Sequence, residues 1–267
     1  MNGIDHLLHR FPPISLRDLN ARAGLMTRRD NKYLLSESQL ATVLQALEGD
    51  FEVLEIGGQR RFRYTSIYLD TDDLHCFRDH NQSRRHRLKL RFRHYLESQE
   101  SYFELKVKDR FDRTRKCRHP VDPARLGQPE LTPELRDFLL RKLGEHSGRL
   151  SDQPYLHRIE VSYQRSTLVH RHESMRITLD NRLHFAGHNR QYAAAGDLWI
   201  AEVKSERGRS AVDRLMLQLG IRPVPRCSKY CVGLSLTDTV SRVSRFTPTV
   251  NRIRRMGDPP VKPGEQA

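Results

Sequence analysis

Two stretches of this sequence alternate strictly between charged and apolar side chains, and this period constrains the fold more than any other feature. Residues 87–95 read RLKLRFRHY, and residues 102–108 read YFELKVK. Successive side chains of a β-strand point to opposite faces, so both stretches predict strands with one apolar and one charged face. The charged faces carry Arg87, Lys89, Arg91 and Arg93 on the first strand, and Glu104, Lys106 and Lys108 on the second.

Strand-like sequence recurs along the chain, at residues 29–35, 62–70, 112–119, 157–161, 176–180 and 199–204. Helices with one apolar face are expected at residues 36–47, 133–143, 210–219 and 229–236. Cations about 7 Å apart on one strand repel each other, and enclosing them is unfavourable unless an anion lies between them. The apolar outer face needs helices to cover it. We therefore predict an α+β fold, an antiparallel β-barrel with a cationic lumen and helices packed outside.

The charge of the chain favours an anionic partner. Its 267 residues include 47 Lys and Arg against 33 Asp and Glu, a formal net charge of +14. Nucleic acid, an acidic membrane surface and phosphate-rich small molecules are the candidate classes. No run approaches the roughly 20 apolar residues of a membrane helix, so no membrane segment is expected. The opening residues lack the apolar core of a secretory signal, and the four cysteines are expected as free thiols, which together predict a cytoplasmic protein.

Patterning divides the chain into three parts. Residues 1–25 are expected to form a partly helical leader, because Pro12 and Pro13 interrupt regular structure there. Residues 26–237 carry the alternating strands and are expected to form the barrel domain. Residues 238–267 are rich in Ser, Thr, Arg and Pro without sustained periodicity, which predicts a flexible basic tail.

Three glutamates, Glu104, Glu160 and Glu202, share strand faces with basic residues. Each one either neutralises a neighbouring Arg or Lys, or helps to hold a divalent metal beside a bound phosphate. Mg²⁺ and Mn²⁺ take oxygen ligands from one or two carboxylates and from phosphates, so both interpretations suit a cationic lumen.

Eight short motifs follow one another in a fixed order. They are R-x-x-x-K-Y at residues 28–33, Y-x-S-x-Y-x-D-T at 64–71, R-x-R-x-Y at 91–95, F-E-x-K at 103–106, Y-x-R at 163–165, R-x-T-x-D at 176–180, E-x-K at 202–204 and S-K-Y at 228–230. Their order and spacing resemble the polyphosphate polymerase domain of the vacuolar transporter chaperone (VTC) family, within the triphosphate tunnel metalloenzymes. The resemblance covers residues 28 to 233.

The resemblance implies an eight-stranded antiparallel tunnel in which ATP and Mn²⁺ or Mg²⁺ bind. The γ-phosphate of ATP would move onto a growing polyphosphate chain, so ATP and polyphosphate are the implied partners, and no specific nucleic acid is expected. The implied catalytic residues are Lys32, Arg91, Arg93, Lys106, Arg158 and Arg176. The implied substrate-binding residues are Arg28, Lys89, Lys204, Arg226 and Lys229. Glu202 is the implied metal ligand.

The chain departs from related patterns at two places. The adenylate cyclase and thiamine triphosphatase branch opens with E-x-E-x-K, whereas residues 28–32 read RRDNK, which favours the polymerase branch. Arg226 stands where a lysine is expected, and an arginine keeps the charge while changing its geometry.

Two alternative functions stay open. A tunnel hydrolase would cleave inorganic triphosphate or a nucleoside triphosphate in the same lumen, with water as the acceptor, and a more acidic lumen would favour it. A nonenzymatic binder of polyphosphate or nucleic acid would also suit the charge. Binders of single strands, however, interleave aromatic residues for base stacking, and we expect the basic strands here to direct aliphatic residues outward.

Overall fold

A computed structural model describes residues 3–23, 29–108, 114–127, 131–145, 151–188, 190–206, 209–240 and 245–257 of the chain. The strands of its sheet are β1 (Pro13–Ile14), β2 (Arg29–Leu35), β3 (Phe51–Leu54), β4 (Phe62–Asp70), β5 (Arg87–Tyr95), β6 (Glu100–Lys108), β7 (Thr114–Pro120), β8 (Leu156–His170), β9 (Arg176–Gly187), β10 (Gln191–Ala193) and β11 (Trp199–Ser205). The helices are α1 (Gly3–His9), α2 (Leu16–Ala23), α3 (Glu37–Leu47), α4 (His75–Asn81), α5 (Pro133–Glu145), α6 (Ala211–Gln218), α7 (Lys229–Leu236) and α8 (Thr247–Gly257), with a 3₁₀ turn η1 (Pro123–Gly127).

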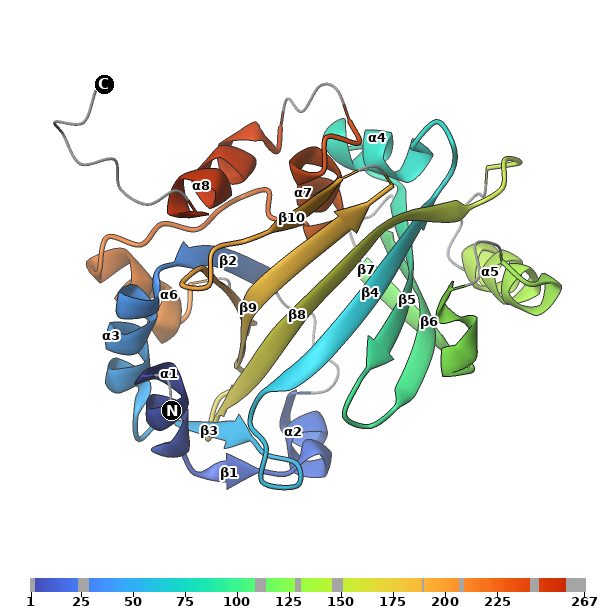
Figure 1. Ribbon diagram of the computed structural model, residues 1–267. Helices are drawn as coiled ribbons and strands as arrows, with labels where there is room; N and C mark the ends of the chain where they lie inside the picture. The colour runs from blue at the N-terminus through green and yellow to red at the C-terminus, as the bar shows by residue number, and fades with distance from the viewer. Residues whose placement is uncertain are drawn as a thin grey trace, which may run out of the picture.

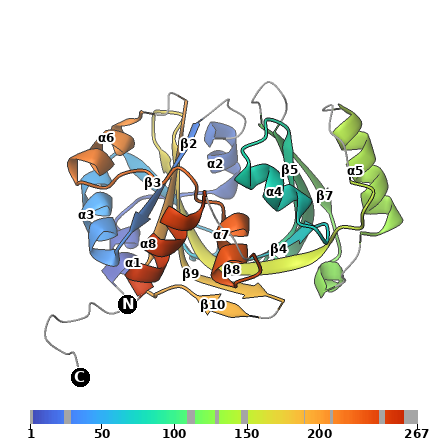
Figure 2. The ribbon, with the colours of Figure 1, turned by 90° about the horizontal axis from the view of Figure 1, so that it is seen from above.

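The main path of the sheet is antiparallel, in the order β2-β11-β9-β8-β4-β5-β6-β7. Figures 1 and 2 show that it bends strongly, so that β2 and β5 stand on opposite arms. Among the described strands, β2 and β7 do not pair, and the closed barrel expected from the sequence is not confirmed. The edge of β2 is instead bonded from outside the sheet, because its Lys32 carbonyl accepts a 2.7 Å hydrogen bond from the Val224 amide.

The two faces of the curved sheet differ in chemistry. On the outer face, α1, α3 and α6 bury apolar side chains of β2, β9 and β11, and α5 packs on β6 and β7. The inner face carries the charged side chains of the alternating strands. Helix α7 packs on the inner face of β8 and β9 with Gly233, where an added Cβ would lie 2.6 Å from Ile159 Cδ1. This close approach requires a glycine and leaves the remainder of the inner face to the charged groups.

Local sequence explains where the helices begin. Ser36 caps α3 and forms a reciprocal capping box with Gln39, and Ser210 and Asp213 form the same arrangement at α6. Asp70, at the end of β4, is fully buried and accepts amide hydrogen bonds from Cys76 and Phe77 of α4. Tyr230 of α7 donates to the same carboxylate, so one side chain joins β4, α4 and α7.

Helices lie near both ends of the chain, and both pack on the rest of the structure. Ile4, Leu7 and Leu8 of α1 lie in the core beside α3, so this part of the first 25 residues belongs to the packed structure. The segment expected as a flexible tail contains α8, which buries Val250 and Ile253. The four cysteine thiols are free, as the sequence predicted. Among the described residues, every helix is too short or too polar to serve as a membrane span.

Candidate functional site

Strand register brings charged side chains of β2, β5, β6, β9 and β11 together on the inner face. Lys32 of β2 lies opposite Glu202 of β11, and Lys89 of β5 lies opposite Lys106 of β6. Arg176 of β9 is in register with Lys204 of β11. The alternation read in the sequence thus places cations from distant parts of the chain on one surface.

Three lysines, Lys32, Lys89 and Lys106, form the centre of this surface. The Lys32 ammonium donates to the Cys227 carbonyl at 2.9 Å, and Lys89 donates to the Ser228 hydroxyl at 2.9 Å. Within the described structure, the Lys106 ammonium has neither a hydrogen bond nor an ion pair. Burial, together with nearby cations that include Lys106, lowers the pKa of Lys89 to about 7. Burial and the charge of Lys32 likewise lower the pKa of Lys106. A bound anion would stabilise the protonated form of both side chains.

Glu202 is the carboxylate nearest to this centre. Its Oε1 lies 2.8 Å from the Lys204 ammonium, which also lies 3.5 Å from Asp30 Oδ2. Burial alone would raise the pKa of Glu202, but the charges of Lys32 and Lys204 hold it well below its ordinary value. In return, the Glu202 and Asp30 carboxylates outweigh burial and raise the pKa of Lys32. Glu202 is therefore ionised, as a metal ligand must be.

A divalent cation fits this site only with help from its substrate. Within the described parts of the chain, no three His, Cys, Asp or Glu side chains are grouped closely enough to hold a metal. The ionised oxygens of Glu202 suit Mg²⁺ or Mn²⁺, and Mg²⁺ is commonly held by one or two carboxylates plus substrate phosphates and water. Glu202 therefore fits as a single protein ligand that acts together with a bound phosphate.

A second ion-pair group lies further along β5, β6 and β7. Arg91 Nη2 lies 2.6 Å from Glu104 Oε2, and the Lys116 ammonium lies 2.5 Å from Glu104 Oε1. Glu104 is 2% exposed. Burial would raise its pKa, but Arg91, Arg93 and Lys116 hold the pKa of this carboxyl well below its ordinary value. Glu104 thus neutralises its neighbours, which is one of the two roles considered for it from the sequence.

Arg93 is enclosed by tyrosines rather than by carboxylates. Its guanidinium donates to the Tyr163 hydroxyl and lies 5.3 Å and 5.9 Å from the ring centres of Tyr64 and Tyr95. Its Nε is buried without a hydrogen-bond partner among the described residues. The sequence predicted that the basic strands direct aliphatic residues outward, and the structure adds that tyrosines lie among the basic side chains of the inner face. The Tyr64 and Tyr163 rings stack with their centres 5.4 Å apart, so one face of each ring is covered by the other.

Asp180 joins β8, β9 and α7 beneath the tyrosines. Its carboxylate accepts hydrogen bonds from Arg165 at 2.5 and 2.8 Å and from Lys229 at 2.5 Å. Burial opposes ionisation, but Arg165 and Lys229 hold the pKa of Asp180 at about 2. Lys229 therefore lies at the site and is already neutralised by a carboxylate.

A cavity of about 410 Å³ opens beside this surface, between β2, α4 and the segment that precedes α7. Lys32, Arg87, Arg226 and Ser228 are among its lining residues. Arg226, expected to bind substrate, lies at this opening. The cavity gives a solvent route to Lys32 and to Ser228, the hydroxyl that Lys89 contacts.

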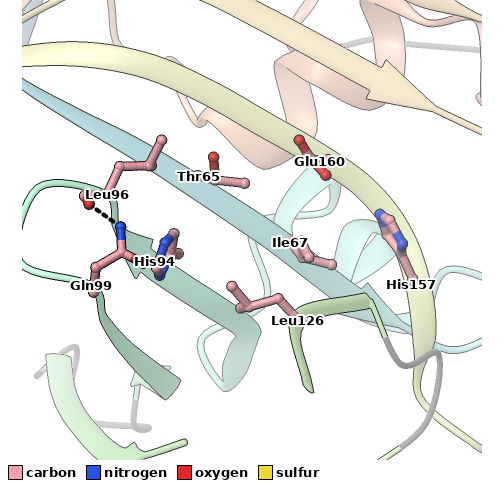
Figure 3. Close-up of a pocket in the computed structure, with 8 residues that line it drawn as sticks. All are labelled: Thr65, Ile67, His94, Leu96, Gln99, Leu126, His157 and Glu160. Carbon is pink, nitrogen blue, oxygen red and sulfur yellow. Dashed lines mark hydrogen bonds between the residues drawn. The ribbon is translucent and has the colours of Figure 1, made fainter. Parts of the chain in front are cut away.

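Two predicted site residues do not join the others. Arg158 precedes Ile159, which contacts α7 on the inner face, so Arg158 points to the outer face and pairs there with Asp72 at 2.6 Å. Glu160 also points outward, into a pocket of about 440 Å³ that Ile67, His94 and His157 help to line (Figure 3). The placement of Arg158 in the cationic wall is corrected accordingly. Arg28 lies outside the described residues.

Several members of the site were not predicted from the sequence, namely Lys116, Arg165, Asp180, Tyr64, Tyr163 and Tyr68, whose hydroxyl accepts a 3.1 Å hydrogen bond from Arg91. Arg165 and Asp180 were present in the motifs at residues 163–165 and 176–180 but had no assigned role. Lys116 could have been found from its phase, because it alternates with Cys117 in the strand expected at 112–119.

Comparison with known proteins gives a family match and distant structural likenesses. The family model described as the VTC domain matches residues 27–237. No curated protein matches the sequence significantly. A Hippeastrum protein, whose description reports a dominant triphosphatase activity, is 17% identical with a TM-score of 0.45. The alignment covers 79% of this chain and 96% of that protein. For a Pyrococcus horikoshii protein the identity is 15%, the TM-score 0.43 and the coverage 78% and 96%, respectively.

Proposed function

The chain belongs to the VTC domain family, and from this premise we propose that it transfers the γ-phosphate of ATP to the end of an inorganic polyphosphate chain. The reaction would take place on the inner face of the sheet and would require Mn²⁺ or Mg²⁺. Glu202 would hold the metal, which would neutralise phosphate charge when bound.

The observation that supports this proposal best is the excess of cations around Lys106, which cluster on the inner face with few carboxylates. Lys89 and Lys106 have pKa values lowered by burial, and Arg93 contacts tyrosines instead of a carboxylate. Such groups destabilise the empty protein and are relieved by a polyanion. A row of phosphates carries charges at short, regular spacing and therefore matches cations that lie on neighbouring strands.

The residues present suit phosphoryl transfer. The transferred group needs alignment and neutralisation of its charge, and it needs little covalent help from the protein. In the proposed reaction Lys32, Lys89 and Lys106 bind phosphate oxygens, while Arg91 and Arg93 offset charge on the transferring group. The attacking atom is an oxygen of a terminal phosphate, so no protein nucleophile is required.

The acceptor is proposed to be a phosphate chain rather than water. A hydrolase would benefit from additional carboxylates that bind metal and activate water. On the inner face, Glu104 and Asp180 are each bound to two cations, and Glu202 is bound to Lys204. These carboxylates mainly balance charge, which favours the polymerase over the hydrolase.

Incubation with ATP and Mn²⁺ tests the proposal. We expect ADP and long phosphate chains, visible on a polyacrylamide gel stained for polyphosphate. The Lys32→Ala variant should lose activity by about 100-fold or more, because a buried phosphate partner is removed. Arg63→Ala is the matched control, since Arg63 is exposed on β4 and pairs with Glu97. Orthophosphate as the product would indicate hydrolysis instead. The absence of any turnover would favour the remaining alternative, a nonenzymatic binder of polyphosphate or nucleic acid.

A further inference from the structure

Two arginines meet at one hydroxyl group at the mouth of the 410 Å³ cavity. The Nη1 atoms of Arg226 and Arg245 each lie 2.8 Å from Ser83 Oγ and donate hydrogen bonds to it. The two nitrogens therefore cannot be further apart than twice this distance. Two guanidinium groups so close repel each other, and an anion placed between them would remove that repulsion.

The mouth of the cavity has little negative charge to balance these arginines. Among the described residues, neither Arg226 nor Arg245 has a carboxylate within ion-pair distance. Asp30 also lines the cavity, but its carboxylate lies 3.5 Å from the Lys204 ammonium. The cations Lys32 and Arg87 line the same cavity. The mouth is thus continuous with the cationic inner face.

Buried contacts of α8 fix the position of these groups. The Thr249 hydroxyl is 2% exposed and donates to the Arg226 carbonyl at 2.9 Å. Phe246, which follows Arg245 directly, is buried against Phe77 of α4 with ring centres 6.3 Å apart. The backbone at Arg226 and beside Arg245 is therefore held by the packing of Phe246 and α8, and Figure 2 shows α8 beside α7.

We propose that Ser83, Arg226 and Arg245 form a second phosphate-binding site, which takes one phosphate group of a condensed phosphate that also occupies the inner face. This inference rests on the proposed function, since it assumes a condensed phosphate on the central lysines. Arg245 lies beyond residues 27–237, which the family model matches. Guanidinium groups suit this role because their parallel N–H donors match two phosphate oxygens.

A second site makes affinity depend on chain length. A chain long enough to reach both the central lysines and the mouth makes the second contact intramolecularly, at a high effective concentration. A tripolyphosphate that spans only the central lysines gains nothing from the mouth. The site thus retains long products in preference to short ones.

Binding measurements without ATP test this inference. We expect Arg245→Ala to weaken binding of long-chain polyphosphate by about tenfold and that of tripolyphosphate by less than about twofold. Arg255→Ala is the control, because Arg255 is an exposed arginine of the same helix. An equal loss for both ligands, or the same loss in Arg255→Ala, would overturn the second site, since it would reflect net charge alone.

Two further arms separate this inference from the proposed function. If ATP yields no polyphosphate while Arg245→Ala still shows the length-dependent loss, the polymerase proposal fails and the second site stands. If polyphosphate is made but Arg245→Ala binds long chains like the wild type, the second site alone fails. Competition with orthophosphate identifies the occupant: loss of long-chain binding to the level of Arg245→Ala at low orthophosphate concentrations would indicate a free phosphate and contradict the condensed chain.

Discussion

Lys32 and Lys106 approach each other across the inner face, although five strands separate β2 from β6 in the order of the sheet. They are close enough for the charge of Lys32 to lower the pKa of Lys106. This proximity requires the strong bend of the sheet that Figure 2 shows. The curved sheet thus concentrates cations of both arms without hydrogen-bonded closure between its described edge strands.

Lys106 is the first residue to test, because its ammonium has no hydrogen bond or ion pair within the described structure. We expect Lys106→Met to fold normally and to keep the stability of the wild type to within about 0.5 kcal/mol, since the Lys106 side chain is exposed. Its turnover of ATP should fall by about 100-fold. Thermal unfolding and initial rates measure the two effects. A variant of unchanged activity would mean that the central lysines do not bind the reacting phosphates.

The lowered pKa of Lys89, about 7, predicts a pH-dependent affinity for anions. The protonated form binds phosphate, so affinity should fall as the pH rises from 7 to 9, by up to about tenfold per unit. Lys89→Arg keeps its charge over this range and should lose the dependence. The affinity of the wild type and of Lys89→Arg for tripolyphosphate is measured by titration at several pH values. Both proteins bind the same ligand, so the difference between their two curves excludes the effect of ionisation of the tripolyphosphate. If the affinity of both proteins changed in the same way with pH, the pH dependence would not come from Lys89.

The strands and helices were largely predictable, because their information is local. The period of two in residues 87–95 and the helical spacing in residues 36–47 both appear as β5 and α3. The helix α8 was missed, because an apolar stripe of only Val250 and Ile253 beside Phe246 is hard to distinguish from a polar segment. Its stability comes from packing on distant elements, which a local pattern does not contain.

Only one property of the site was predictable from the sequence: which side chains of a strand share a face. The alternation along residues 87–95 correctly placed Lys89, Arg91 and Arg93 on one face of β5. Alternation alone does not show which face of a strand points to the inside of the curved sheet. Arg158 illustrates this limit, because it alternates with Ile159 and both faces of β8 are partly buried. A register shift between Tyr68 and Leu69 of β4, opposite this part of β8, further disturbs the pattern. The sharing of Asp180 by Arg165 and Lys229 depends on tertiary structure and left no local signal.

The position of Arg158 on the outer face gives a prediction that differs from the catalytic role implied by the family resemblance. Because its guanidinium pairs with the exposed Asp72 on the outer face, Arg158→Ala should keep turnover within about twofold of the wild type. The resemblance alone would predict a large loss. Steady-state rates at saturating ATP distinguish these results, and a loss similar to that of Lys32→Ala would restore Arg158 to the site.

The buried ion pairs of Glu104 should make the free energy of unfolding of the protein depend on pH and on bound tripolyphosphate. Its pKa is lower in the folded than in the unfolded protein, so its stabilising effect is present above the ordinary pKa of about 4.3 and is lost as the pH falls through the folded value. Glu104→Gln should lower the free energy of unfolding by about 3–5 kcal/mol, because Arg91 and Lys116 lose their buried partner. Tripolyphosphate should restore part of this loss in thermal melts. A melt unchanged by both the substitution and the ligand would contradict the assigned ion pairs.

Glu202 tests the metal requirement, and Glu160 provides the matched control from the outer face. Glu202→Gln keeps the size of the side chain but removes the ionised oxygens that suit Mn²⁺, so turnover should fall by about 100-fold or more at any metal concentration. Binding of tripolyphosphate without metal should persist, because Lys32, Lys89 and Lys106 remain. Glu160→Gln should match the wild type in both measurements. Undiminished Mn²⁺-dependent turnover in Glu202→Gln would show that Glu202 only neutralises Lys32 and Lys204, and that the metal is held by phosphate oxygens or by another carboxylate.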